Sequence, residues 1–277
     1  MNLPKLPLGD WIETLEAWLE NHFDPLFELI RVIIGSVVDF LASVLMLGPS
    51  LVMLLVLTLI AWLIGKWRIG IFALIGLLLI DNLGYWEHAM ETLAIVLAAS
   101  LFSILVGVPV GILCARSRVA QNVLTPVLDF MQTMPAFVYL LPAVSFFSLG
   151  VVPGVIASII FAVPPTIRLT NLGIRQVPAE LVEAANAFGS TPNQKLLKLQ
   201  LPMALPTMMA GINQTIMLSL SMVVISSMIG AQGLGADVYR AVTQTKTGQG
   251  FEAGLAIVVL AILLDRLTSR VMKKNKR

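Results

Sequence analysis

Long runs of apolar residues, separated by short polar segments, constrain this chain more than any other feature of its sequence. A helix needs about 20 apolar residues to cross a bilayer. The clear runs are 89–114, 124–149, 151–167, 205–229 and 251–267, and the shorter runs 51–65 and 69–83 predict a helical hairpin. Only 12% of the residues are charged, about half the share in a soluble domain. We therefore predict an all-α integral membrane protein with about seven transmembrane helices.

The charged residues divide between the two sides that seven spans would create. One side would carry Lys66, Arg68, Arg116, Arg118, Arg168, Arg175, Lys195, Lys198 and the basic residues of 266–277. The other would carry Asp81, Glu87, Glu91, Asp237, Glu252 and the acidic residues of the first 48 positions. Because basic loops stay in the cytosol, we expect the N-terminus outside, the C-terminus inside, and the polar segment 171–202 inside.

The first 48 residues are harder to assign. Their later part is long enough to cross the membrane, but Glu28, Arg31, Gly35 and Asp39 form a polar stripe along it. Each charge at the centre of a span costs about 2.5–3.5 kcal/mol. An amphipathic helix on the outer surface is therefore favoured, with an eighth span whose stripe faces protein as the alternative.

These expectations divide the chain into four parts. Residues 1–48 would be the external amphipathic segment and 49–84 the helical hairpin. Residues 85–270 would be the membrane core, which contains the segment 171–202. Residues 271–277 would be a basic cytosolic tail.

The polar segment EAANAFGSTPNQKLLKLQLP carries strong signals of local structure. Pro178, just before it, can open a helix, because its missing N–H would have no helical partner there. Gly189 stands where a left-handed helix end is needed. Thr191, Pro192 and Gln194 then follow the pattern of an N-cap, a first-turn proline and a capping-box glutamine. We predict two short helices joined at a tight corner.

This segment resembles the EAA loop of ATP-binding-cassette (ABC) importer permeases. The matching residues are Glu183, Ala184, Ala185, Gly189, Leu201 and Pro202, with Leu199 in place of the usual Ile. The resemblance implies that they couple ATP hydrolysis by a separate ATPase to the membrane helices. An ordinary loop between two spans is the alternative. The complete spacing, on the side assigned to the cytosol from charge alone, favours the coupling loop.

Candidate residues for a solute pathway lie in two of the apolar runs. One run contains Met131, Gln132, Thr133, Met134, Pro135, Phe137 and Tyr139, and the other contains Asn213, Gln214 and Ser221. A proline in mid-membrane frees backbone carbonyls, which is tolerated only against protein or a wet cavity. Methionine and aromatic side chains could line a passage for a methylated ammonium. The alternative is that these residues only hold helices together.

Other kinds of chemistry have little support. No G-x-x-x-x-G-K-[ST] motif is present, so no P-loop is predicted. Cys114, the one cysteine, is expected to be a small buried hydrophobe. His22 and His88 lack the spacing of metal ligands. Asp129 could act as a proton or ion relay, but a paired or solvated position near the cytosolic end of its run is preferred.

Most of the chain also resembles the glycine betaine/proline betaine permeases. The resembling stretches are GYWEHAMETLAIVL, LDFMQTMPAFVYLLPAVSFF, GVVPGVIASIIFAVPPTIRLTNLGIRQVPAELVEAANAFGST, AGINQTIMLSLSMVVISSMIGAQGLG and VYRAVTQTKTGQGFEAGLA. The resemblance implies a type I ABC importer permease in the cytoplasmic membrane of a prokaryote. Two copies would form the pathway, two ABC ATPase subunits would bind ATP and Mg below it, and an external binding protein would deliver an osmoprotectant such as glycine betaine.

This chain itself would then be no enzyme, with no cofactor of its own and no nucleic-acid partner. Three alternatives remain open. The first is an ion-coupled secondary betaine transporter, which would usually carry a deep ionisable site or an inverted repeat. The second is a membrane scaffold that transports nothing. The third is an ABC permease for choline or carnitine.

Overall fold

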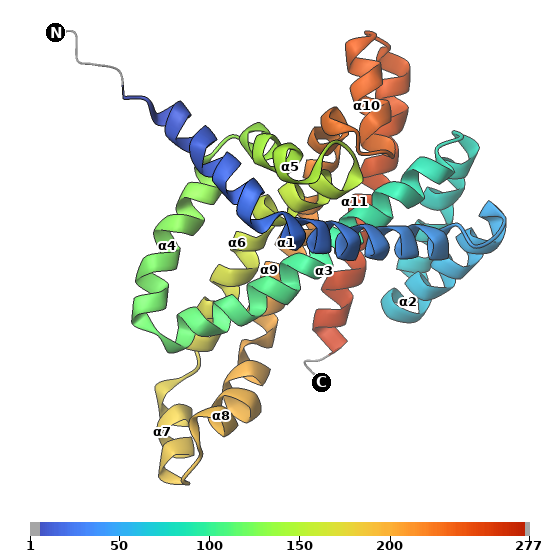
Figure 1. Ribbon diagram of the computed structural model, residues 1–277. Helices are drawn as coiled ribbons and strands as arrows, with labels where there is room; N and C mark the ends of the chain where they lie inside the picture. Colours follow the sequence, from blue (N-terminus) through green and yellow to red (C-terminus); the bar gives the residue numbers. More distant parts are fainter. Residues whose placement is uncertain (1–5, 275–277) are drawn as a thin grey trace.

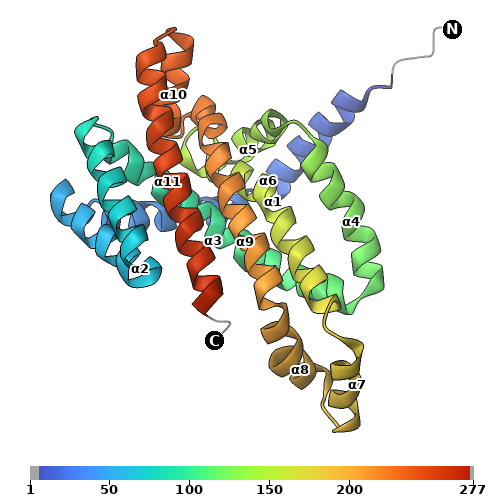
Figure 2. The same ribbon diagram turned by 180° about the vertical axis from the view of Figure 1, so that it is seen from behind.

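The computed structural model describes residues 6–274, with side chains through Arg270, and they form helices and connecting turns (Figure 1). The helices are α1 Leu8–Leu45, α2 Ser50–Asn82, α3 Trp86–Arg116, α4 Arg118–Thr133, η1 Ala136–Tyr139, α5 Leu140–Phe147, α6 Val151–Arg175, α7 Ala179–Ala187, α8 Pro192–Lys195, η2 Leu196–Gln200, α9 Leu201–Ser226, η3 Ser227–Ile229, α10 Leu234–Thr243 and α11 Thr247–Lys274. The all-α prediction is confirmed. Helices α7 and α8 project at one end of the molecule and α10 lies at the opposite end, as both views show (Figures 1 and 2).

Helix α6 lies at the centre, between α3 and α9, because glycines on both neighbours let the backbones approach closely. A Cβ atom at Gly107 would lie 2.7 Å from Cγ2 of Thr166, and one at Gly111 would lie 2.6 Å from Cβ of Thr170. On the other side, a Cβ at Gly211 would lie 2.9 Å from the carbonyl oxygen of Pro165. The Gly-x-x-x-Gly pattern of α3 therefore marks a helix contact.

Small hydroxyl side chains join α6 to α9 inside this contact. The Oγ1 atoms of Thr166 and Thr215 lie 2.8 Å apart, and Thr215 donates to the carbonyl of Ala162 at 2.7 Å. Ser226 donates to the carbonyl of Gly154 at 3.1 Å. All of these hydroxyl groups are buried. Each therefore has a protein partner at a depth where water cannot provide one.

Four helical stretches of the described chain are long and apolar enough to cross a membrane: α2, α3, α6 and Pro192–Ile229. A fifth is possible if α4 and the stretch Ala136–Phe147 count as one broken span. The described chain therefore has four to five candidate spans, and the count of about seven stays a prediction. Helices α1 and α11 do not meet this measure of length and composition.

The run 124–149, predicted as one span with a proline inside it, is sharply bent. Helix α4 ends at Thr133, and the next helical stretch leaves it at an angle of 107°. Met134 is extended, with φ −67° and ψ 138°, because the proline that follows disfavours the helical conformation. Pro135 also lacks an N–H to continue the helix. The expected proline break is therefore present, but it produces a sharp corner.

Helix α2 folds back on itself at Lys66, whose φ of 65° breaks the helical geometry. Ala61 before the break and Ile69 and Ala73 after it belong to one buried cluster, together with Leu263 of α11. Nearer the two ends of α2, Leu54 and Ile80 share another cluster. The two arms therefore lie side by side and pack against α11.

Helix α1 is one continuous helix whose polar stripe faces protein in part. Ile34 and Val38 pack among residues of α3, α6 and α9. Arg31, Gly35 and Asp39 line a cavity of about 170 Å³ at the turn between α5 and α6. The helix begins at Leu8 without a side-chain cap, and Asp10 lies in its first turn.

Candidate functional site: the α7–α8 hairpin and the bent segment

The first candidate site is the hairpin of α7 and α8. After α7, the N–H of Ser190 donates to the carbonyl of Ala185 at 3.0 Å, and the N–H of Gly189 donates to that of Asn186 at 2.9 Å. Gly189 has φ +74°. These two bonds with a left-handed glycine form a Schellman helix end. The predicted corner at Gly189 is confirmed.

Helix α8 begins with the predicted capping box. The N–H of Gln194 donates to Oγ1 of Thr191 at 3.3 Å, and the N–H of Thr191 donates to Oε1 of Gln194 at 2.9 Å. Pro192 occupies the first turn, where no N–H is needed. A π-helical turn, η2, then leads without a break into α9. The hairpin is therefore connected by continuous helix to the part of α9 that packs against α6.

Two side-chain bonds hold the hairpin together and to the rest of the molecule. Lys195 Nζ donates to Oδ1 of Asn186 at 2.9 Å, which ties α8 to α7. Arg116, at the end of α3, donates to Oδ1 of Asn193 at 2.7 Å. The hairpin is thus linked to α3 by a side chain and to α6 and α9 through the backbone.

The hairpin offers most of its surface to an external partner. Helix α7 has no buried residue, and Phe188 at its end is 90% exposed. Of the residues that match the EAA pattern, Glu183, Ala184, Gly189 and Pro202 are exposed, and Ala185, Leu199 and Leu201 are half-buried. An exposed aromatic side chain beside alanines is suited to insertion into a cleft of another protein.

The bent segment, residues 131–139 at the end of α4 and in η1, contains seven of the pathway candidates. Tyr139 is buried, and its hydroxyl donates to the carbonyl of Met131 at 2.5 Å, which closes the corner. Met131 and Met134 are half-buried, whereas Gln132, Thr133, Pro135 and Phe137 are exposed. This corner presents polar and aromatic groups on a surface that the described chain does not cover.

The candidates on α9 separate into two groups. Gln214 and Ser221 are exposed and seven residues apart, so they share one face of the helix. Asn213 instead faces α11. Its Nδ2 donates to Oδ1 of Asp265 at 2.9 Å, and its Oδ1 accepts from Oγ1 of Thr268 at 2.6 Å. The structure does not bring Asn213 together with the other candidates.

Asp129 is paired, as preferred from the sequence. Its Oδ1 lies 2.6 Å from an amino group of Arg168, and the side chains of Asp129 and Arg168 are 61% and 40% exposed. Cys114 is buried, also as expected. Among residues 6–274, no three His, Cys, Asp or Glu side chains gather closely enough to hold a metal ion.

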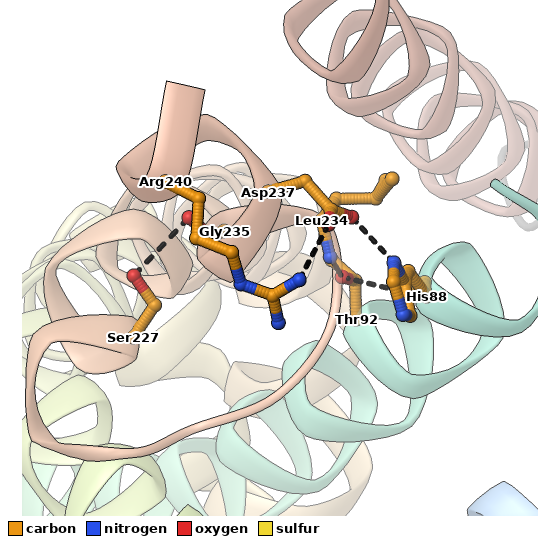
Figure 3. Close-up of polar contacts among 7 residues, drawn as sticks. All are labelled: His88, Thr92, Ser227, Leu234, Gly235, Asp237 and Arg240. Atoms are coloured by element: carbon orange, nitrogen blue, oxygen red, sulfur yellow. Dashed lines mark hydrogen bonds and ion pairs between the residues drawn. The ribbon is translucent and has the colours of Figure 1, made fainter. Parts of the chain in front are cut away.

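Sequence reasoning missed a cluster that joins the start of α3 to α10 (Figure 3). Nδ1 of His88 lies 2.5 Å from Oδ2 of Asp237, and Arg240 reaches the same carboxylate at 3.6 Å. The N–H of Leu234 donates to Oγ1 of Thr92 at 2.9 Å. The positive φ of Gly233, +102°, allows this approach. The glycines before α10 indicated a tight turn there. His88 and Asp237 are 149 residues apart, so no local sequence pattern indicated that they would pair.

Comparison with known proteins identifies the family. Residues 107–276 match the family described as binding-protein-dependent transport system inner membrane component. The chain is 53% identical to the glycine betaine transport system permease protein OpuAB of Bacillus subtilis, over 99% of this chain and 97% of that protein. It is 55% identical to the glycine betaine/carnitine transport permease protein GbuB of Listeria monocytogenes, over 99% of each.

Two further matches are informative. The chain is 48% identical to the glycine betaine/proline betaine transport system permease protein ProW of Escherichia coli, over 98% of this chain and 77% of that protein. A chain of the MetNI methionine ABC transporter, solved in inward-facing conformations, matches with a TM-score of 0.62 and 22% identity, over 67% of this chain and 93% of that one. The helices therefore adopt an ABC importer permease fold, and the chain belongs to the binding-protein-dependent transport system inner membrane components.

Proposed function

We propose that this chain is the permease subunit of an ATP-driven importer for glycine betaine or a related quaternary-ammonium osmoprotectant. The observation that carries the proposal is identity of about half of all residues, over nearly the whole chain, with glycine betaine permeases. The chain would form the pathway and perform no catalysis, which is consistent with the missing P-loop.

The α7–α8 hairpin would be the element that receives movement from the ATPase. Its projection from the helix body and the 90% exposure of Phe188 support contact with a partner. The side-chain link to α3 and the uninterrupted path into α9 support transfer of that movement to the membrane helices. Glu183, Ala184, Ala185, Gly189, Leu199, Leu201 and Pro202 would form or support the docking surface.

The complete transporter would contain two copies of this chain, two ABC ATPase subunits that bind ATP and Mg, and an external substrate-binding protein. Gln132, Thr133, Phe137, Gln214 and Ser221 are exposed in the single chain. Facing a second copy or a wet passage would cover these polar groups, which lipid would not favour.

The orientation would follow the positive-inside rule. Lys195 and Lys198 lie in α8 and η2, and Arg116, Arg118 and Arg175 lie at the adjoining helix ends, whereas α10 at the opposite end of the molecule carries one basic residue, Arg240. We propose that the hairpin lies in the cytosol and α10 outside, with seven spans, residues 1–48 on the outer surface, and the tail 271–277 inside.

The pathway would favour a zwitterion over a net cation. Its candidate carboxylate, Asp129, is held by Arg168 at 2.6 Å, so the pair contributes little net charge to a passing cation. A betaine is neutral overall and suits a passage of carbonyls, amides and aromatic faces. A relative named for choline, the cation, is only 27% identical over 66% of this chain, whereas GbuB, named for the zwitterions glycine betaine and carnitine, is 55% identical over 99% of it.

Reconstitution tests the proposed function. Vesicles with this chain, its cognate ATPase and its binding protein should accumulate glycine betaine only when ATP is supplied inside. Uptake driven by an ion gradient without the ATPase would support the secondary-transporter alternative. Uptake of choline as fast as or faster than glycine betaine, in variants that no longer need the binding protein, would overturn the proposed pathway preference.

A further inference from the structure

An open groove of about 460 Å³ lies between the second arm of α2 and the last turns of α11. The two helices run antiparallel, because Ile80 clusters with Ala256 at one end of the contact and Ile69 clusters with Leu263 at the other. The groove lies at the second end, beside the bend at Lys66.

The groove is cationic at its mouth and apolar deeper along the helices. Arg68, Arg266 and Arg270 line it together with Ile69, Phe72 and Ile262. One helical turn separates Arg68 from Phe72, and one separates Arg266 from Ile262. In antiparallel helices these steps point the same way, so the arginines gather near the bend and the apolar side chains extend towards the middle of the spans.

The balance of charge in the groove is positive. Nε of Arg266 lies 3.9 Å from Oδ2 of Asp265, and the same carboxylate accepts the amide of Asn213. The guanidinium of Arg68 lies 5.5 Å from the centre of the Trp67 ring. Trp67 is 59% exposed, as is typical of aromatic residues at a membrane–water boundary. Among the described residues, Asp265 is therefore the one carboxylate within 4 Å of the three guanidinium groups of the groove, and it lies beside Arg266 alone.

We propose that this groove binds the headgroup of an anionic phospholipid, with an acyl chain lying along Ile69, Phe72 and Ile262. Basic pockets between membrane helices on the cytoplasmic side suit such headgroups. The outer faces of α2 beyond the groove carry exposed Leu63 and Ile75. Because α2 is long and apolar enough to cross the membrane, these faces would contact lipid. An anionic phospholipid is the anion that such a site would meet at the highest concentration. The inference concerns the membrane helices alone and does not depend on the transported solute.

Lipid retention by the purified chain, alone and with its ATPase bound, tests the proposal. Native mass spectrometry would compare phosphatidylglycerol with phosphatidylcholine on the wild-type chain and on Arg68→Gln/Arg270→Gln. Each basic residue near an anionic headgroup contributes about a fivefold factor in binding. We expect preferential retention of phosphatidylglycerol, weakened by about 25-fold in the double variant and largely kept by Arg68→Lys/Arg270→Lys.

Arg118→Gln, which removes an exposed charge at the start of α4 away from the groove, is the matched control and should bind as the wild type does. Equal retention of the two lipids, or an equal loss in the control, would overturn the proposal. Glycerol phosphate binding as tightly as the lipid would show a simple anion site. Loss of the lipid when the ATPase binds would show a protein-docking surface. Unchanged thermal unfolding of the glutamine variant would exclude misfolding.

Discussion

Gly189 has a backbone conformation on which the shape of the proposed coupling hairpin depends. A Cβ there would have no atom within 4 Å, yet φ is +74°. The penalty for a side chain is therefore conformational, about 1 kcal/mol or more for ordinary residues and larger for β-branched ones. We expect Gly189→Val to insert normally but to lose solute uptake and bind the ATPase less tightly. Uptake assays and ATPase copurification would measure both effects.

Gly189→Asn provides the control for this prediction, because asparagine tolerates the left-handed conformation. It should keep most of the transport that Gly189→Val loses. Equal loss in both variants would mean that the surface at the corner matters and its conformation does not. Normal uptake by Gly189→Val would show that the hairpin is not the coupling element.

The sequence predicted this corner because every partner is local. The glycine, the capping-box pair and the first-turn proline interact within a few residues of one another. Asn213 was placed among the pathway candidates, whereas its partners lie 52 and 55 residues later on α11. Its polarity indicated that it must face protein or water, and only the packing of α9 against α11 selects between the two.

At the level of elements, the contact of α3 with α6 depends on the missing side chain of Gly111. A Cβ there would lie 2.6 Å from Cβ of Thr170 and 2.8 Å from the carbonyl oxygen of Ile167. Backbone cannot move aside as a flexible side chain can, so Gly111→Ala should destabilise the protein by about 1–3 kcal/mol. Gly254→Ala on α11 meets no atom within 4 Å and should be neutral or slightly stabilising. Thermal unfolding in detergent would compare them; equal midpoints would contradict the close contact.

The turn before α10 depends on one hydroxyl of α3. Thr92 and Leu234 are fully buried, and the hydroxyl accepts the N–H of Leu234 at 2.9 Å. Thr92→Val keeps the shape but leaves that N–H without a partner, at a cost of about 1–3 kcal/mol. Hydrogen exchange should accelerate through α10, and Thr92→Ser should retain the protection. Unchanged exchange in Thr92→Val would show that the bond does not hold α10.

For the whole molecule, hydropathy predicted the class of the protein better than the course of each segment. Apolar runs located α3, α6 and α9, because a helix that crosses the bilayer must be apolar along most of its length. Hydropathy did not predict the 107° corner after α4, since a sharp turn packed against α6 and α9 is as apolar as a straight span. Nor did it predict that α1 continues from Leu8 to Leu45.

Orientation is the property of the whole molecule that charge predicts most sharply. We expect single cysteines at Lys66, Arg118 and Lys195 to be shielded in intact, right-side-out cells, and cysteines at Glu87 and Lys246 to react with an impermeant thiol reagent. A Cys114→Ala background removes the buried native thiol, and permeabilisation should expose the first three. The physical reason is that basic residues resist translocation whereas acidic ones contribute little. The α7–α8 hairpin, which contains Lys195, and α10, which Lys246 follows closely, lie at opposite ends of the molecule (Figures 1 and 2), so cysteines at these two positions should not react from the same side. External reaction at Lys195→Cys would reverse the orientation and remove the hairpin from any cytosolic ATPase.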